Sequence, residues 1–387
     1  MTMSHDDAAW FATNFAQIAH NVSTAVLGKE HVIRLTVATL LAEGHMLLED
    51  APGTGKTSLA RALAATVDGT HKRIQFTPDL LPTDVTGVTV YDQRRGEFEF
   101  RPGPIFASIV LADEINRASP KTQSALLEVM EEGQVTIDGT TRPVGRPFMV
   151  IATQNPIDQA GTYRLPEAQM DRFLMKTSIG YPGHTDMVEI LAGANIRNRA
   201  ARVKPVVNSE MVTSMCDMGA TVFTEPSVLD YVAAIGEASR RVPETRIGIS
   251  TRGVLSMIRV AKVWAASQGR EYVVPDDVKQ LAGPVWQHRL MLDPDAEFGG
   301  VTAGNVIARI LNDVPVPPGK SQAAAGPART VAPPASRAAP APRTPPPAPL
   351  GPVAPVAPLQ TGITGSTMSS PAQGGQDPSL VFQQWAQ

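Results

Sequence analysis

The fold of this chain is decided by the stretch His45-Met-Leu-Leu-Glu-Asp-Ala-Pro-Gly-Thr-Gly-Lys-Thr57. It predicts a buried strand over His45–Leu48, a tight turn rich in glycine and proline, and a helix that begins near Lys56 and runs to Ala65. Such a turn directs main-chain N–H groups and a helix N-terminus at one point, where an anion is stabilised. In a phosphate-binding loop of this kind, Lys56 reaches the β- and γ-phosphates and the Thr57 hydroxyl coordinates Mg²⁺. The sequence therefore predicts a nucleotide site.

The loop departs from the general phosphate-loop pattern at one position, where Asp50 replaces the first glycine. The alternative interpretation is a glycine-rich turn that binds nothing, but such a turn does not need a lysine followed by a threonine at the helix start. The residues expected to hold the nucleotide at this loop are Pro52, Gly53, Thr54, Gly55, Lys56, Thr57 and Ser58.

Composition excludes several classes of protein. The chain has 387 residues, of which 43% are hydrophobic, so it is long enough for two domains and a tail. The single cysteine, Cys216, excludes an internal disulfide and fits a reducing compartment. The N-terminus lacks the basic start and apolar run of a signal peptide, and no apolar stretch reaches membrane-spanning length. We therefore expect a soluble, cytoplasmic protein without a membrane span.

The sequence divides into four segments. They are an N-terminal helix over 1–20, a nucleotide-binding α/β core over 21–182, an all-α domain over 183–314 and a tail over 315–387. The tail is dominated by Pro, Ala, Gly, Ser and Thr, which cannot bury enough apolar surface to offset ordering entropy, so we expect it to be disordered. The rest of the chain keeps 30 basic and 36 acidic residues, a net charge of about −6, which argues against nucleic acid as a partner.

Inside the predicted core, apolar runs indicate strands and alternating runs indicate hairpins. The predicted strands are His45–Leu48, Lys72–Phe76, Ser108–Glu114, Phe148–Asn155 and Lys176–Ile179. The predicted hairpins are Val88–Arg101 and Gln134–Pro143. The first alternates in character, which predicts a half-exposed hairpin that projects from the sheet. The second turns at Asp138-Gly139, the strongest short-range hairpin signal.

Two carboxylates end the third predicted strand. Ser108–Glu114 is an apolar run without alternation, which is typical of a central parallel strand that is covered on both faces. Ligands of open α/β sheets bind at the carboxyl ends of the strands. We therefore expect Asp113 to hold Mg²⁺ and Glu114 to polarise an attacking water. The alternative is a strand that ends in solvated acids.

Three further features are ambiguous from the residues alone. Val26-Leu-Gly28 breaks two predicted helices and lies either beside an adenine or in an ordinary turn. Asn155 either hydrogen-bonds a γ-phosphate and the attacking water or is a turn residue before a proline. Arg252 lies in the first turn of a helix capped by Ser250, where a cation opposes the helix dipole. A bound phosphate would offset that cost, and a solvent-exposed arginine is the alternative.

Taken in this order along the chain, these motifs give a specific resemblance. Over roughly residues 20–312 the sequence resembles a MoxR-type AAA+ ATPase. The stretches that carry the resemblance are Leu48–Thr57 for Walker A, Ala112–Ala118 with Lys121–Glu128 for the Walker B region, and Gly103–Phe106, Ala152–Pro156 and Glu167–Phe173 for other signatures.

The resemblance implies a fold and a set of roles. The fold is a P-loop AAA+ core with a five-stranded, mostly parallel sheet and two inserted hairpins, followed by an all-α lid domain. The implied roles are Lys56 and Thr57 for phosphate and Mg²⁺, Asp113 and Glu114 for Walker B, Asn155 for sensor 1, Arg172 for the arginine finger, Arg252 for sensor 2 and Val26–Gly28 for adenine. Lys56, Asn155 and Arg252 would gather the phosphates.

Arg172 depends on the resemblance alone. It lies at the end of the short helix predicted over Leu165–Phe173, where a cation is electrostatically favourable, so the residues by themselves indicate a structural role. The resemblance makes Arg172 a finger that reaches the site of a neighbouring subunit. Arg117 and Arg164 are the rival candidates.

The resemblance also implies a function and partners. It implies a Mg–ATP hydrolase that acts as a ring, expected to be a hexamer, on a protein client with a von Willebrand factor A domain partner. The alternatives are a magnesium-chelatase-like motor subunit and a DNA-associated AAA+ motor, of which the acidic body disfavours the second. The apolar tail end, Leu380–Trp385, is either a docking peptide or part of a solubilising linker.

Overall fold

The computed structural model describes residues 2–51, 53–155, 163, 165–193 and 199–317, and every structural statement below concerns these residues. Pro52, Arg164 and nearly all of the predicted tail, including Leu380–Trp385, lie outside them. Within the described part of the chain, no helix is both long enough and apolar enough to cross a membrane.

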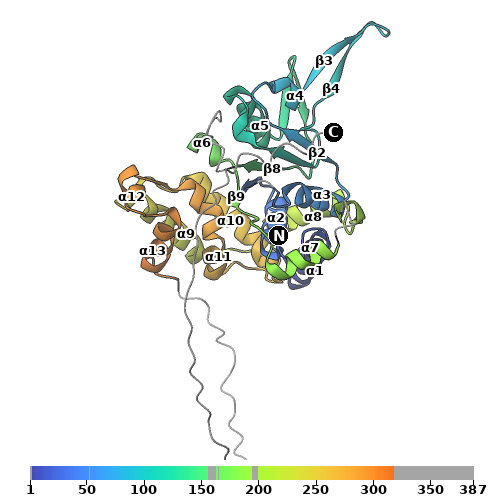
Figure 1. The fold of residues 1–387 in the computed structure, drawn as a ribbon. Helices are drawn as coiled ribbons and strands as arrows, with labels where there is room; N and C mark the ends of the chain where they lie inside the picture. Colours follow the sequence, from blue (N-terminus) through green and yellow to red (C-terminus); the bar gives the residue numbers. More distant parts are fainter. Residues whose placement is uncertain (1, 52, 156–162, 164, 194–198, 318–387) are drawn as a thin grey trace, which may run out of the picture. The chain divides into compact units, whose positions relative to one another are not determined.

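The centre of the fold is a five-stranded sheet in which all neighbouring strands are parallel (Figure 1). Its strands are β1 (Met46–Glu49), β2 (His71–Gln75), β5 (Ile109–Asp113), β8 (Met149–Gln154) and β9 (Met175–Thr177), in the spatial order β2-β5-β8-β1-β9. The predicted strands are therefore confirmed. The carboxyl ends of β1, β8 and β5 lie at one edge of the sheet, which is where open α/β folds place their ligands.

Both faces of the sheet are buried, as the apolar runs predict. The face that carries Leu48 and Ile151 belongs to one apolar cluster, and the face that carries Leu47 and Val150 belongs to another. The first cluster includes side chains of α1 (His5–Ser23), α2 (Glu30–Leu41) and α3 (Lys56–Thr66), and the second includes side chains of α5 (Pro120–Glu132). The sheet thus separates two cores and holds the start of α3 at its edge.

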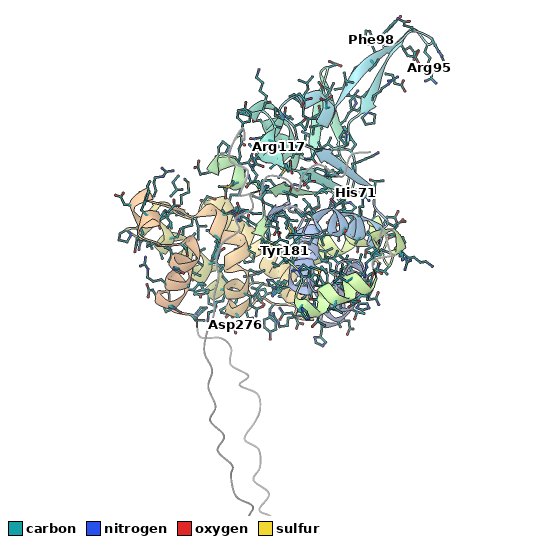
Figure 2. The ribbon with its side chains drawn as sticks, viewed as in Figure 1. His71, Arg95, Phe98, Arg117, Tyr181 and Asp276 are labelled. Carbon is teal, nitrogen blue, oxygen red and sulfur yellow. The ribbon has the colours of Figure 1, made fainter. Side chains whose placement is uncertain are left out.

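Two hairpins leave this core. After α4 (Pro82–Thr86), β3 (Gly87–Asp92) pairs with β4 (Glu97–Pro102), and β6 (Gln134–Ile137) pairs with β7 (Thr140–Pro143). Each pair forms a two-stranded antiparallel sheet of its own, so both predicted hairpins are confirmed. Figure 2 shows Phe98 and Arg95 at the far end of the first hairpin, where Phe98 is 76% exposed and its ring centroid lies 5.2 Å from that of Tyr91.

The helix between the hairpins, α5, begins and ends at local capping signals. The Ser119 hydroxyl caps α5 by accepting the N–H of Thr122, Pro120 is its first residue, and Gly133 follows it in the left-handed region at φ 64°. These local signals fix the last turn of α5, which carries Glu131. The short helix predicted over Leu165–Phe173 is shorter in the structure, because α6 covers only Glu167–Met170.

The chain after Gly183 is mainly helical. Its elements are α7 (His184–Ala192), η2 (Arg199–Arg202), α8 (Ser209–Ala220), α9 (Pro226–Arg241), α10 (Thr251–Ala266), α11 (Pro275–Trp286), η3 (Gln287–Arg289), α12 (Pro294–Phe298) and α13 (Ala303–Asp313). A small antiparallel sheet of β10 (Thr245–Ile247) and β11 (Met291–Leu292) was not predicted, since strands of three and two residues are too short to show alternation. Val260 of α10 and Trp286 of α11 share the first apolar cluster with Leu48, so these helices pack on the core.

His45, at the start of the deciding stretch, is a buried polar residue with both ring nitrogens in contact with the main chain. Nδ1 accepts the N–H of Val150 at 3.0 Å, so the proton lies on Nε2, which donates to the Met130 carbonyl at 2.9 Å. Burial lowers the pKa of His45 to about 4. The imidazole therefore joins two elements of the core as a neutral group.

This buried imidazole predicts an acid-sensitive stability. In the unfolded chain His45 takes up a proton below about pH 6.5, whereas the folded chain excludes it down to about pH 4, so stability is full above pH 6.5 and falls as the pH drops between these values. At pH 5 the loss is about 2 kcal/mol. We expect His45→Gln to remove this part of the difference in free energy of unfolding between about pH 7.5 and about pH 5, measured by urea denaturation. Equal pH dependence in both proteins would contradict it.

Candidate functional site

The phosphate loop joins β1 to α3 at the sheet edge. Gly53 and Gly55 have positive φ angles of 84° and 99°, and a Cβ atom at either position would meet nothing within 4 Å. Gly55 is the N-cap of α3, and no side chain caps the helix. The N–H groups of the first turn therefore face open space at the positive end of a helix dipole. This is a cradle that fits a phosphate group.

Lys56 is held across the same loop. Its Nζ donates to the carbonyl oxygens of Asp50 at 3.2 Å and Ala51 at 2.8 Å. Neutral carbonyls are weaker partners for an ammonium than phosphate oxygens are, because the attraction between opposite charges adds to the hydrogen bond. Lys56 can therefore exchange these contacts for a phosphate without leaving the loop.

Asp50, the departure from the loop pattern, has a structural reason. Its buried carboxylate accepts the main-chain N–H of Ile179 and that of Gly180, the latter at 3.1 Å. Both donors belong to the segment that follows β9. A glycine at position 50 would offer them no acceptor. The carboxylate thus fastens the start of the phosphate loop to the segment that leads into α7.

A cavity of about 770 Å³ opens beside the loop, which is within the usual range for a small-molecule site. One side is formed by the loop and α3, with Gly53, Thr54, Gly55, Thr57 and Ser58. The other side is formed by Val26 and Leu27, between α1 and α2, and by Tyr181, Met187 and Ile190 (Figure 2 labels Tyr181). The cavity thus combines the phosphate loop with apolar walls that suit a base.

Three residues predicted for this region, Gly28, Pro52 and Lys56, are not among the described residues that line the cavity. Gly28 has a φ of 68° and lies directly against the Asp186 carboxylate of α7, so a side chain there would clash. Pro52 lies outside the described residues. The remaining predicted loop and adenine residues line the cavity.

Asp113, at the end of β5, is held by two side chains from the strands on either side. One carboxylate oxygen accepts the hydroxyl of Thr153 on β8 at 2.6 Å. The other accepts two N–H groups of Arg73 on β2, at 2.6 Å and 3.2 Å. The carboxylate of Asp113 and the hydroxyl of Thr57 are hard oxygen donors, which is the donor chemistry that Mg²⁺ takes. These residues fit the metal that the resemblance implies.

Glu114 follows in the left-handed region, with φ 57°. Its main-chain N–H donates to the Thr153 hydroxyl at 2.9 Å, and its carboxylate accepts Gln75 Nε2 at 3.1 Å and Arg117 Nη1 at 2.9 Å. The carboxylate is thus oriented from two sides. The ion pair also gives Arg117, a rival finger candidate, a partner within its own chain. Asn155, half-buried, directly follows β8, the neighbour of β5.

Arg73 and Gln75 contact the two carboxylates but were not predicted from the sequence. They lie two residues apart on β2, and Gln75 is paired in register with Asp113 on β5. The side chains of Arg73, Gln75 and Asp113 therefore share one face of the sheet. A signal was present in the alternation of Lys72–Phe76, but using it requires knowing that β2 lies next to β5.

Arg172 and Arg252 meet on a different surface. Arg172 Nε contacts one carboxylate oxygen of Glu131 at 3.0 Å, and Arg252 Nη2 contacts the other. Both arginines, together with Arg259, line a cavity of about 360 Å³. The described residues that line the larger cavity at the phosphate loop include neither Arg172 nor Arg252. Within one chain, Arg252 is therefore brought to Arg172 and not to the cavity beside Gly55.

Comparisons with known proteins agree with this geometry. Residues 45–175 match the model of the ATPase family associated with various cellular activities (AAA), and residues 237–310 match the AAA lid domain. Uncharacterized protein YeaC of Bacillus subtilis is 46% identical over 297 residues, which cover 77% of this chain and 93% of that protein. Chaperone MoxR1 of Mycobacterium tuberculosis is 40% identical over 305 residues, which cover 76% of this chain and 80% of that protein.

A solved structure and a more distant relative extend the comparison. The structure of a candidate ATPase from Cytophaga hutchinsonii is 37% identical with a TM-score of 0.76, and the match covers 80% of this chain and 97% of that one. The magnesium-chelatase 38 kDa subunit of Rhodobacter capsulatus is 24% identical over 335 residues, which cover 71% of this chain and 89% of that protein.

The role of Asp50 predicts a stability effect. Asp50→Ala removes the acceptor of two main-chain N–H groups and should lower the free energy of unfolding by about 1–3 kcal/mol. Asp230→Ala, on the exposed face of α9, is the matched control and should stay within about 0.5 kcal/mol of the wild type. Urea denaturation measures both. An Asp50→Ala protein as stable as the control would show that the carboxylate does not fasten the loop.

Proposed function

Because this chain belongs to the MoxR family of AAA ATPases, we propose that it hydrolyses Mg–ATP in a site shared by two copies and uses the reaction to remodel a protein client. The observation that carries the shared site is the meeting of Arg172 and Arg252 on Glu131. Two guanidinium groups on one carboxylate leave a net positive charge, and both side chains are partly exposed. A phosphate of a second copy complements such a pair.

In the proposed mechanism, the chain positions the triphosphate with its own loop. The N–H groups around Gly53 and Gly55 and the Lys56 ammonium bind phosphate oxygens, while Val26 and Leu27 border the base. Thr57 and Asp113 would hold Mg²⁺, which neutralises phosphate charge when bound. Thr153 and Arg73 keep the Asp113 carboxylate in place for this purpose.

Glu114 is proposed to orient the water that attacks the γ-phosphate. Gln75 and Arg117 hold its carboxylate, so its direction is set before the substrate arrives. Asn155, beside it at the end of β8, donates its amide N–H to the γ-phosphate. Arg172 and Arg252 of the neighbouring copy supply the remaining positive charge. Phosphoryl transfer needs little more than such positioning and charge neutralisation.

A shared site requires assembly, and we propose a closed ring of six copies. The core over 21–182 and the lid over 183–314 are the proposed domains, and their relative movement during the cycle would move the two hairpins against the client. The exposed aromatic rings of Phe98 and Tyr91 on the first hairpin are suited to bind apolar side chains of an unfolded segment of the client. A von Willebrand factor A domain protein is the proposed partner.

A second candidate function is that of a magnesium-chelatase-like motor subunit, which the likeness to the Rhodobacter protein supports. Both candidates use the same ATP site and differ in what the movement acts on. Purification of the Glu114→Gln protein with its bound partners from cells distinguishes them, since co-purification of another magnesium-chelatase subunit would favour the second.

Mixed assemblies test the shared site. Glu114→Gln destroys the catalytic carboxylate but keeps both arginines, whereas Arg172→Ala keeps the carboxylate but loses the finger. We expect each protein alone to lose about 10³-fold or more in ATP turnover. An equal mixture should regain about a quarter of the wild-type rate, because about a quarter of randomly formed neighbours combine an intact site with an intact arginine.

The control variant is Arg309→Ala, used in place of Arg172→Ala. It removes an arginine that pairs with Glu244 on the lid surface. That protein alone should turn over ATP at the wild-type rate. A mixture of Glu114→Gln and Arg172→Ala that stays inactive would reject a site completed by the second copy, and an active Arg172→Ala protein would remove Arg172 from its role.

A further inference from the structure

Arg289, at the end of η3, is a charged residue in the interior of the described lid. Its side chain is only 1% exposed. Burial lowers the pKa of its guanidinium from the ordinary value, and the Asp171 carboxylate opposes that shift. A buried guanidinium is costly unless its N–H groups are satisfied and its charge is paired. The hydrogen-bond partners of Arg289 therefore show what its burial stabilises.

Most of those partners lie in the segment that carries the proposed arginine finger, and the others are the Val285 carbonyl and the Ser256 hydroxyl. Nε donates to the Asp171 carboxylate at 2.7 Å, and Nη2 donates to the Asp171 and Phe173 carbonyls at 3.1 Å and 2.7 Å. Nη1 donates to the Leu174 carbonyl at 3.2 Å. One guanidinium thus holds the main chain on both sides of Arg172. The Arg172 side chain itself pairs with Glu131.

The same cluster holds the start of the helix that carries Arg252. The second oxygen of the Asp171 carboxylate accepts the Ser250 hydroxyl at 2.9 Å, and Ser250 is the N-cap of α10. The Arg289 side chain also packs against Gly253, where an added Cβ would lie 2.8 Å from Arg289 Cδ. Asp171 and Arg289 therefore connect the two segments that end in Arg172 and Arg252.

We propose that Arg289 is a positioning residue that fixes Arg172 and Arg252 at one spacing, so that the two are presented together to the phosphates of the neighbouring copy. The inference rests on the shared site proposed above. Arg289 is too buried to touch phosphate, so it acts through the other two arginines. Without the Arg289 guanidinium, the segment around Arg172 loses these hydrogen bonds and can shift. Displacements of about 1 Å cost up to about 100-fold in rate.

Loss of Arg289 should weaken the arginines that a subunit donates to its neighbour, but not the nucleotide site in which the subunit accepts its neighbour's arginines. A subunit without Arg289 keeps its own phosphate loop, Asp113 and Glu114, so it should still hydrolyse ATP when a normal neighbour supplies the arginines. The same subunit should fail as a donor to others. A purely structural role for Arg289 predicts equal loss in both directions, because an unstable lid harms donor and acceptor alike.

Two mixtures measure the two directions. In the acceptor arm, Arg289→Met is mixed with Glu114→Gln, which can only donate. In the donor arm, the double variant Arg289→Met with Glu114→Gln is mixed with Arg172→Ala, which can only accept. Both are compared with the reference mixture of Glu114→Gln and Arg172→Ala. We expect the acceptor arm to remain within about twofold of the reference and the donor arm to fall about 10–100-fold.

The matched control is Arg270→Met, which breaks a partly buried ion pair with Asp277 inside the lid, at 2.6 Å and 2.9 Å, away from Arg172. It should affect both arms equally. If Arg289→Met does not fold, Asp171→Asn is used in the same two arms with the same expectation. Equal losses in both arms, or a donor arm at the reference rate, would overturn the role of Arg289. If the reference mixture is active in the same experiment, the shared site is still supported. An inactive reference mixture would reject the shared site and the proposal with it.

Discussion

Two arginines from distant parts of the chain share one carboxylate, and the proposed chemistry depends on that contact. Arg172 follows α6 and Arg252 lies in the first turn of α10, yet both contact Glu131 at the end of α5. Holding two like charges together is unfavourable unless an anion lies between them. Glu131 supplies one negative charge, which is less than a triphosphate offers. We therefore propose that the arginine pair binds phosphate, at a surface whose lining is separate from that of the chain's own phosphate loop.

The sheet explains why the phosphate loop and the pair formed by Arg172 and Arg252 lie on separate surfaces. The carboxyl ends of β1, β5 and β8 bring the phosphate loop, Asp113 and Asn155 to one edge, because parallel strands all end on the same side. Helices α10 and α11 pack on the core through the apolar cluster that includes Leu48, and Arg289 ties them to the segment around Arg172. Arg252 on α10 is therefore held beside the segment that carries Arg172.

Local patterns made much of this predictable. The phosphate loop, the apolar strand ending in Asp113, the Asp138-Gly139 hairpin and the caps of α5 each depend on residues that are close in sequence, so spacing and turn chemistry identify them. The lengths of the smallest elements were not predictable. α6 is a single turn and β10 and β11 have three and two residues, which gives no periodicity to detect.

The contacts that join distant segments could not be predicted, because no local sequence pattern records them. Asp50 is bonded to residues 129 and 130 positions away, and Arg289 to residues up to 118 positions away. Arg73 becomes meaningful only once β2 is known to lie beside β5. The position of Arg252 next to Arg172 likewise depends on how the lid packs, which no local pattern records.

The most direct test of the shared site is a structure of the Glu114→Gln oligomer with Mg–ATP bound. The measured quantity is the distance from the Arg172 guanidinium to the nearest γ-phosphate oxygen. The account predicts a hydrogen bond of about 2.7–2.9 Å to the ATP of the neighbouring copy, with Arg252 beside it. An ATP enclosed by a single copy, with Arg172 and Arg252 still paired to Glu131 and no second copy at the phosphates, would contradict it.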